Sequence, residues 1–561
     1  MSTTAQSQPA SHEQAVRDFT LEAAMARLSG SPEALNACVE CVDRHIAADG
    51  SSGLALRAIA ADGTGRDYTF AELRDLSARM ANVLTAQGIK AGDVVAGLLP
   101  RGVDLVATIL GTWLIGAVYQ PLFTAFGPKA IEHRFHTSGA KLVVTNPANR
   151  AKIAEIPDAP PVATVLKAGE ALPAGDLDLA AALAASSADF APVMRRADDL
   201  FMMMSTSGTT GLPKGVPVPL RAMLAFEAYM REAVGLRTGD VFWNIADPGW
   251  AYGLYYAITG PLLLGIATTL YEGSFTAEST YELITRLGVT NLAGSPTAFR
   301  LLMAAGPEAA AAVKGRLRAV SSAGEPLNPE VIRWFDAHLG APIFDHYGQT
   351  ETGMVVNNHH GLSHPVHPGS AGFAMPGYRV AVLDAEGREL GPNQPGVLAV
   401  DIEASPLLWF TGYYRKDTPA IAGGYYRTGD SVELEPDGRI SFIGRSDDLI
   451  TSSGYRIGPF DVESALIEHP AVTEAAVIGV RDPERTEIVK AFVILAPDAT
   501  PSEALAEELR QHVRKQLSAH AYPRAVDFVT ELPKTPSGKI QRFLLRKAEI
   551  EKLEAAATPA A

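Results

Sequence analysis

The sequence predicts an α/β protein with a large N-terminal domain, whose subdomains contain parallel sheet, and a small C-terminal α+β domain. Three observations lead to this prediction. The chain has 561 residues, more than one hydrophobic core usually holds. Through the first half, segments with helical periodicity alternate with short apolar runs, which is typical of parallel sheet covered by helices. After residue 445 this alternation gives way to a different pattern.

The alternation can be followed along the first 150 residues. Between residues 70 and 88 the apolar positions recur at helical spacing, and residues 94–99 form an apolar run typical of a buried strand. The next elements that we expect are helices at 105–114 and 129–136, and strands near Val118 and at 142–145.

A loop rich in glycine and hydroxyl residues occupies residues 205–215, directly after the apolar run 200–204. Glycine allows backbone N–H groups to converge on an anion, hydroxyls add donors, and Lys214 adds a positive charge. This predicts a phosphate-binding loop, the alternative being a flexible linker. A Walker A motif is excluded because Pro213 stands where that motif needs glycine. The loop residues expected to bind a nucleotide triphosphate are Thr206, Ser207, Gly208, Thr209, Thr210, Gly211 and Lys214.

Two other polar segments also follow apolar runs. Residues 323–326 come after the run 317–320, and residues 347–351 come after the run 342–344. Ligands of open α/β sheets bind beyond the carboxyl ends of the strands. We therefore expect both segments to share one cleft with the phosphate-binding loop.

A second domain begins after Arg445. Strands are expected at 477–480 and 489–495, and helices at 462–468 and 502–517, which is the pattern of a small α+β unit. Residues 555–561 are low in complexity and are predicted to be disordered.

Composition and charge exclude several classes of partner. The net charge of −15 argues against nucleic acid or an anionic membrane surface as a main partner, since both favour a basic face. The first 16 residues have no basic start followed by an apolar core, and the apolar stretches near Leu105 and Leu262 are interrupted, so no secretory signal or membrane span is predicted. We expect a cytoplasmic protein.

Two clusters of metal-binding residue types are interpreted as structural. Cys38 and Cys41 lack a second pair, so two core-facing residues one helical turn apart are expected rather than a redox or zinc site. The histidines between residues 359 and 367 lie among Asn, Gly and Pro, which predicts a loop rather than a zinc site.

Several motifs in one order carry a family resemblance. Besides residues 205–215, 323–326 and 347–351, they are residues 426–430 (YRTGD), 444–448 (GRSDD), 453–459 (SGYRIGP) and 533–539 (PKTPSGK). Together these motifs resemble the adenylate-forming superfamily of acyl-CoA synthetases, adenylation domains and luciferases, over nearly the whole chain. The pattern of residues 347–353 is most similar to the medium-chain acyl-CoA synthetases.

The resemblance implies an enzyme that uses ATP, Mg²⁺ and coenzyme A to convert a carboxylic acid to its CoA thioester through an acyl-AMP. It implies that Lys539 neutralises charge between the carboxylate and the α-phosphate, that Thr350 contacts the α-phosphate, and that Glu351 binds Mg²⁺. Asp430 would accept the ribose hydroxyls with Arg445 beside it. The other implied ATP or AMP contacts are Gly324, Glu325, Pro326, Asp345, His346, Tyr347, Gly348, Gln349 and Arg456.

The family also implies a moving C-terminal lid. A hinge at Asp447 would separate domain 1–446 from domain 447–561, and its rotation would exchange Lys539 for the loop at Gly454 before the thiol attacks. Gly454 and Tyr455 would line the pantetheine path. Arg134 is a weaker candidate for the CoA phosphates, the alternative being an ordinary exposed helix arginine. Lys539 also resembles the site acetylated in acyl-CoA synthetases, which implies a lysine acetyltransferase as a partner.

The acid is predicted from the segment 247–254, which resembles the acyl pocket of acetyl- and medium-chain synthetases. Acetyl-CoA synthetases carry tryptophan where this chain has Gly348, and valine at the positions of Ala323 and Ala251. A deeper slot, bounded also by Trp250 and Tyr252, is therefore expected to suit a short- to medium-chain fatty acid, with Tyr252 as the bulky exception. The alternatives are a benzoate-like acid, loading of a carrier protein, and a non-catalytic nucleotide sensor. The sensor would be expected to lack Lys539 or Glu351, and both are present.

Overall fold

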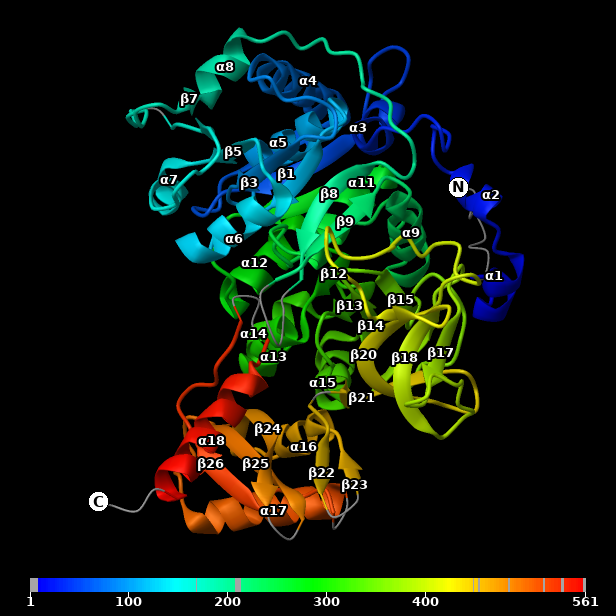
Figure 1. The fold of residues 1–561 in the computed structure, drawn as a ribbon, viewed down its shortest axis with the longest axis vertical. Coiled ribbons are helices and arrows are strands. Elements are labelled where there is room, and N and C mark those ends of the chain that lie inside the picture. Colours follow the sequence, from blue (N-terminus) through cyan, green and yellow to red (C-terminus); the bar gives the residue numbers. More distant parts are fainter. Residues whose placement is uncertain are drawn as a thin grey trace.

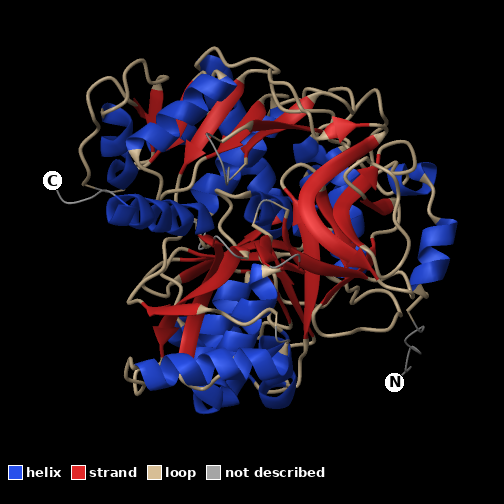
Figure 2. Ribbon diagram, turned by 60° about the horizontal axis from the view of Figure 1, so that its bottom comes forward, coloured by secondary structure: helices blue, strands red, loops and turns tan. Residues whose placement is uncertain are grey.

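The computed structural model describes residues 9–557 except 168, 207–212, 447, 453–454, 483–484, 518–519 and 536–538, and the side chains of 455–456 and 553–557 also lie outside the description. Within this range a large α/β part with two sheets stands above a smaller C-terminal part with one sheet (Figure 1). Figure 2 shows the strands inside the molecule and most of the helices outside them. The predicted fold class is confirmed. None of the helices in the described ranges is long and apolar enough to cross a membrane.

One sheet of the large part carries the first predicted elements. Its strands are β3 (Val94–Leu98), β4 (Val118–Pro121), β5 (Leu142–Thr145), β6 (Val162–Thr164), β7 (Leu177–Asp178), β8 (Leu200–Ser205) and β9 (Gly215–Pro219). Their order is β7-β6-β5-β3-β4-β8-β9, and only the final β8–β9 pair is antiparallel. The helices beside them are α4 (Phe70–Ala86), α5 (Val103–Leu114), α6 (Pro128–Ser138), α7 (Pro147–Ala154) and α8 (Leu179–Ala185). The helix and strand predictions for this region are therefore confirmed.

The second sheet of the large part is parallel on one side and antiparallel on the other. Its strands are β1 (Leu54–Ile59), β2 (Gly65–Thr69), β10 (Phe242–Asn244), β11 (Thr268–Tyr271), β12 (Asn291–Gly294), β13 (Ala319–Ala323), β14 (Ile343–Gln349), β15 (Gly353–Asn357), β16 (Ser370–Ala374), β17 (Val380–Leu383), β18 (Pro395–Asp401), β19 (Ile421–Ala422), β20 (Tyr425–Leu434) and β21 (Ile440–Arg445). The order is β17-β18-β20-β21-β16-β15-β14-β13-β12-β10-β11-β1-β2, with β19 beside β20. Neighbours from β14 to β1 are parallel, and those from β14 to β17 are antiparallel.

Two expectations about this sheet were wrong or incomplete. Residues 347–349 belong to β14 and do not form a loop after it, and β13 runs on to Ala323 instead of ending at residue 320. The antiparallel half was not predicted at all. Its strands follow one another along the chain without helices between them, so the helix–strand alternation that indicates parallel sheet does not predict it.

The remaining helical elements of the large part pack on this sheet or at the N-terminus. They are α1 (His12–Asp18), α2 (Leu21–Met25), α3 (Ala37–Cys41), η1 (Asp43–His45), α9 (Ala222–Ala228), η2 (Tyr229–Ala233), α10 (Ala251–Gly253), η3 (Leu254–Thr259), α11 (Gly260–Leu263), α12 (Ala277–Leu287), α13 (Pro296–Ala304), α14 (Gly306–Ala310), η4 (Ala311–Val313) and α15 (Pro329–Leu339). Cys38 and Cys41 lie on α3, fully buried and not in a disulfide, as expected for core residues.

The histidine-rich run forms a loop after β15, as predicted. His360 stacks on Phe344 at 3.9 Å between ring centroids, and its Nε2 pairs with the Val320 carbonyl at 3.0 Å. The backbone N–H of His359 donates to His364 Nε2 at 2.7 Å. These contacts give the rings of His360 and His364 packing and hydrogen-bonding roles.

The C-terminal part is a small sheet flanked by helices. It contains β22 (Ile450–Ser452), β23 (Tyr455–Ile457), β24 (Val472–Asp482), β25 (Thr486–Leu495), β26 (Ala525–Phe528), α16 (Pro459–Ile467), α17 (Glu503–Gln516) and α18 (Arg542–Ala557). The strand order is β23-β22-β25-β24, with β26 beside β25. It contacts the large part through α15 and α16, where Asn328 Nδ2 donates to the Ser464 carbonyl at 3.3 Å and Arg333 pairs with Glu468 at 3.1 Å.

Candidate active site

A cavity of about 1300 Å³ lies between the two parts of the molecule. It is bordered by the carboxyl ends of β13 and β14, by β20 and β21 from the antiparallel half, and by residues of the C-terminal part. Most of the predicted site residues line it: Thr206, Lys214, Trp250, Ala251, Tyr252, Ala323, Gly324, Glu325, Pro326, Asp345, His346, Tyr347, Gly348, Gln349, Thr350, Glu351, Asp430, Arg445 and Lys539. The expectation that separate strand-end segments converge on one cleft is therefore confirmed.

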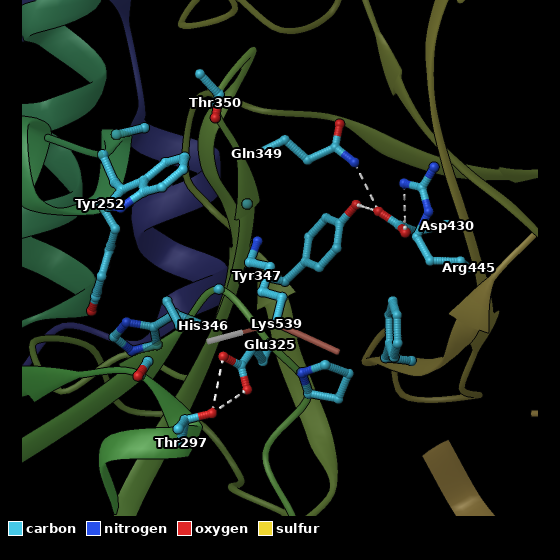
Figure 3. A pocket seen from close by; sticks show the side chains of 18 of the residues that line it. Tyr252, Thr297, Glu325, His346, Tyr347, Gln349, Thr350, Asp430, Arg445 and Lys539 are labelled. Carbon is cyan, nitrogen blue, oxygen red and sulfur yellow. Dashed lines mark hydrogen bonds and ion pairs between the residues drawn. The ribbon is translucent and has the colours of Figure 1, made fainter. Parts of the chain in front are cut away.

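At one end of the cavity three donors converge on the Asp430 carboxylate. Tyr347 Oη and Gln349 Nε2 donate to its Oδ2 at 2.5 and 2.8 Å, and Arg445 Nη1 donates to Oδ1 at 3.2 Å (Figure 3). Burial raises the pKa of Asp430, and the Arg445 charge with the two other donors opposes that rise. The group is thus a fixed carboxylate acceptor, the type of group that a vicinal diol needs.

The neighbouring wall is formed by Gly324, Glu325 and Pro326 after β13. Gly324 adopts a φ of +99°, which few residues other than glycine tolerate. The Glu325 carboxylate accepts from Thr297 Oγ1 at 2.8 Å and from Arg300 Nη2 at 3.3 Å, which fixes its direction (Figure 3). Thr297 and Arg300 were not predicted, because neither belongs to a recognisable motif.

Asp345 supplies a second buried carboxylate beside this wall. Its Oδ1 is buried and has no hydrogen-bond partner among the described residues. Burial also raises the pKa of Asp345 well above its ordinary value. A buried polar atom without a partner costs about 1–3 kcal/mol, so a ligand with a complementary group at this point would regain that energy.

Glu351 marks the phosphate side of the cavity. Its Oε1 accepts a hydrogen bond from Tyr413 Oη at 2.7 Å, and Lys214 Nζ lies 4.4 Å from the centre of the Tyr413 ring. Burial raises the pKa of Glu351, while the Tyr413 hydrogen bond and the Lys214 charge lower it. A carboxylate in this position is the type of ligand that Mg²⁺ prefers, so Glu351 is the residue that would hold the ion together with phosphate and water oxygens. Among the described residues no group of three or more His, Cys, Asp or Glu could hold a metal.

The predicted phosphate-binding loop is described only at its two ends. Thr206 N donates to the Lys214 carbonyl at 2.9 Å, and Lys214 N donates to Thr206 Oγ1 at 3.1 Å, which extends the β8–β9 pairing. Ser207, Gly208, Thr209, Thr210 and Gly211 lie outside the described residues.

Lys539 reaches this cavity from the C-terminal part. Its backbone N–H donates to Thr535 Oγ1 at 3.1 Å, and α18 begins three residues later at Arg542. Arg542 forms a bidentate pair with Glu463 at 2.7–3.1 Å and an ion pair with Asp448 at 3.6 Å, next to the predicted hinge. These pairs fix the start of α18 to α16 and to the chain leaving the hinge.

The residues expected to contact coenzyme A lie mostly outside the described residues. Gly454 and Asp447 lie outside the described residues, as do the side chains of Tyr455 and Arg456. Arg134 is buried, with its guanidinium 3.9 Å from the centre of the Phe126 ring and Nη1 bonded to the Ala130 carbonyl at 2.8 Å. The alternative of an exposed arginine is therefore wrong, and contact of Arg134 with the CoA phosphates stays a prediction.

The acyl end of the cavity is walled by small and aromatic residues. Trp250, Ala251, Tyr252, Ala323 and Gly348 line it as predicted, and Tyr255, Tyr256 and Met354 line it as well. The three tyrosines lie on or beside η3, a π-helical segment of the kind often found at functional sites. No sequence motif predicts a π-helix, so the positions of Tyr255 and Tyr256 in the cavity wall were not predicted.

The expected role of Gly348 needs correction. A Cβ placed on Gly348 would lie 2.2 Å from the Gly353 carbonyl oxygen and 2.7 Å from Met354 Cα and Sδ. The missing side chain therefore does not leave an open slot, because the backbone of β15 and the Met354 side chain already occupy that space.

Comparisons with known proteins agree with this arrangement. Residues 51–414 match the family described as "AMP-binding enzyme", and residues 461–539 match its C-terminal domain. The acetyl-coenzyme A synthetase of Bacillus subtilis (strain 168) is 40% identical over 527 residues, covering 92% of this chain and 91% of the relative.

Two solved structures are also similar. An acyl-CoA synthetase of Brucella canis is 72% identical, with a TM-score of 0.79 over 97% of this chain and 100% of that one. An anthranilate CoA ligase solved with anthranoyl-AMP is 28% identical, with a TM-score of 0.83 over 94% and 99%.

Proposed function

The chain belongs to the AMP-binding enzyme family, and from that premise we propose that this AMP-forming acyl-CoA synthetase activates a short- to medium-chain fatty acid. The observation that carries the proposal is the joint lining of one cavity by Asp430, Glu351 and Lys539. These side chains come from both parts of the molecule and supply an acceptor for ribose, an acidic ligand for Mg²⁺ and a cation.

The nucleotide would occupy the end of the cavity around Asp430. The ribose hydroxyls would donate to the Asp430 carboxylate, and the adenine ring would lie along Gly324–Pro326. The 6-amino group of adenine is a donor that fits the Asp345 Oδ1 acceptor, which has no partner in the described structure. Tyr347 and Gln349 would keep the Asp430 carboxylate oriented for this contact.

The first reaction joins the acid to AMP. A carboxylate oxygen of the acid forms a bond to the α-phosphorus, the bond between the α- and β-phosphates breaks, and pyrophosphate leaves. Two anions must approach each other, so Lys539 and the Thr350 hydroxyl would stabilise the charge that gathers on the α-phosphate. Mg²⁺ bound to Glu351 would neutralise charge on the departing phosphates.

The second reaction transfers the acyl group to coenzyme A. The thiol sulfur attacks the acyl carbon, AMP leaves, and the thiol proton passes to solvent or to the leaving phosphate. We propose that the C-terminal domain, residues 447–561, rotates at Asp447 so that Lys539 withdraws and Gly454 and Tyr455 approach the acyl carbon. The clamp of Arg542 on Glu463 and Asp448 supports movement of this domain as one body.

Three alternatives remain part of the test. The similarity to an anthranilate CoA ligase supports an aromatic acid, and a cavity bordered by several tyrosines could hold one. Transfer to a carrier protein would use the same first reaction. A nucleotide sensor without catalysis would bind ATP and release no pyrophosphate.

The deciding experiment measures pyrophosphate release with ATP across straight-chain and aromatic acids, with and without coenzyme A. We expect acid-dependent pyrophosphate release, and acyl-CoA only when coenzyme A is present. Acid-dependent release without any acyl-CoA would favour carrier loading, and no release with any acid would contradict the proposed enzyme. The highest kcat/KM among the acids separates the aliphatic from the aromatic alternative.

A further inference from the structure

We infer that Met354, a residue outside every recognised motif, sets the length of acyl chain that the enzyme accepts. The inference rests on the proposed function and assigns the floor of its acyl slot to one side chain. It replaces the expectation that Gly348 determines the depth of the slot.

Met354 on β15 lies directly opposite Gly348 on the neighbouring strand β14. The two residues are register partners in the antiparallel β14–β15 pair, beside a β-bulge between Tyr347 and Gly348. Cross-strand partners have neighbouring side-chain positions, and a bulge redirects the side chains next to it. Since glycine has no side chain, the Met354 thioether extends over it, with Sδ 2.7 Å from the place where a Gly348 Cβ would stand.

The position of Met354 is fixed from two sides. Its backbone N–H donates to Tyr256 Oη at 3.2 Å. The preceding residue, Gly353, has a φ of +69°, and a Cβ placed on it would lie 2.9 Å from the same hydroxyl oxygen, so the backbone there suits only glycine. The Met354 side chain is 93% removed from solvent and still borders the cavity, together with Ala251, Ala323 and Tyr252. It therefore forms part of the wall where an acyl chain would end.

Methionine suits this role because it is long, unbranched and apolar. It can close a slot completely and can change rotamer when a chain presses on it. Truncation to alanine removes three non-hydrogen atoms, which is room for about two more methylene groups. Each buried methylene is worth roughly a fourfold gain in kcat/KM if the binding energy is expressed in the transition state.

The test is the profile of kcat/KM against chain length, from acetate to decanoate, for the wild type and three variants. Met354→Ala should move the optimum about two carbons higher, and raise the ratio of the longer acid to the wild-type optimum about tenfold or more. Met354→Phe should move the optimum to shorter acids. Gly348→Ala should lower kcat/KM for all acids by a similar factor, because its Cβ meets the β15 backbone.

Met375→Ala serves as a control for lost packing. Met375 is also buried, lies just after β16 and does not line the cavity, so its truncation should lower Tm without moving the optimum. Identical profiles for the wild type and both Met354 variants would overturn the inference. A Gly348→Ala enzyme with a selectively shortened optimum would also overturn it. A wild type inactive with every straight-chain acid would instead contradict the proposed function.

Discussion

The two ends of the cavity are held in place by different kinds of interaction. Around Asp430 and Glu351, polar groups are fixed by charged or short hydrogen bonds from β14, β21 and the Tyr413 loop. Around Met354 the wall consists of Ala, Gly and Tyr residues held mainly by packing, with uncharged hydrogen bonds only at the Tyr255 and Tyr256 hydroxyls among the described residues. A group fixed by hydrogen bonds must be one particular residue type, whereas a packed wall can be built in many ways. The nucleotide end should therefore tolerate no change, and the acyl end should respond to change with altered selectivity.

The strongest test of this contrast removes the cation at the nucleotide end. We expect Lys539→Ala to reduce adenylation, measured as pyrophosphate release, by at least about a hundredfold with every acid. Thioester formation from supplied acyl-AMP should be largely retained, because Lys539 is proposed to leave the site before the thiol attacks. Equal losses in both reactions would contradict the two-conformation proposal.

Lys534→Ala is the matched control for that variant. Lys534 lies on the same segment, pairs with Glu474 at 2.8 Å and does not line the cavity, so both reactions should remain near wild type. Acetyl-lysine incorporated at position 539 should reproduce the alanine result, because acetylation removes the positive charge. Normal adenylation by the acetylated protein would exclude regulation at this lysine.

A smaller loss is expected at Tyr413, which orients Glu351 without being part of a predicted motif. Tyr413→Phe removes the 2.7 Å hydrogen bond to the carboxylate but keeps the ring beside Lys214. A hydrogen bond to a charged group is worth about 1.5–3 kcal/mol, so kcat/KM should fall at least about tenfold. The Mg²⁺ concentration needed for half-maximal rate should rise, and it is measured by titration at saturating ATP. An unchanged Mg²⁺ requirement would mean that Tyr413 has only a packing role.

These tests separate what could be read from the sequence from what could not. Asp430, Glu351 and Lys539 could be predicted because their chemistry requires those residue types within ordered motifs, and they do share one cavity. The depth of the acyl slot could not, because it depends on the direction of a Cβ that Gly348 lacks. Arg134 shows the same limit: its neighbour Phe126 is close in sequence, but only the fold shows that the ring covers the guanidinium.

Both ends of the cavity depend on a core whose stability should fall in acid. Burial lowers the pKa of His360 to about 4. An unfolded histidine has a pKa near 6.5, so between pH 6.5 and 4 the unfolded state binds more protons and the folded state loses stability as pH falls. His360 alone should lower the folding equilibrium constant by up to about tenfold per pH unit in this range.

Urea unfolding of the wild type and of His360→Gln at pH 8.0, 6.5 and 5.5 measures how the free energy of unfolding changes with pH and so checks the predicted direction. The stability difference between the two proteins should favour the wild type most at pH 8.0 and shrink by about 1.4 kcal/mol between pH 8.0 and 5.5, most of it below pH 6.5. A difference independent of pH would show that the His360 ring is not the titrating group.

The smallest effect is expected at the acyl end, where substitution should redistribute activity among acids. Ala323 is buried, ends β13 and lines the cavity, so the two extra methyl groups of Ala323→Val should narrow the slot. We expect the wild type to use acetate poorly and to gain about fourfold in kcat/KM per carbon from propionate until the slot is full. In the variant the gain should stop about two carbons earlier, while propionate is used nearly as before.

Ala319→Val is the matched control, because Ala319 is equally buried at the start of the same strand and does not line the cavity. It should lower Tm without changing the order of acids. A wild type that prefers acetate would show that the slot is closed nearer the carboxylate than Met354, and a residue other than Met354 would then set the acyl end of the cavity.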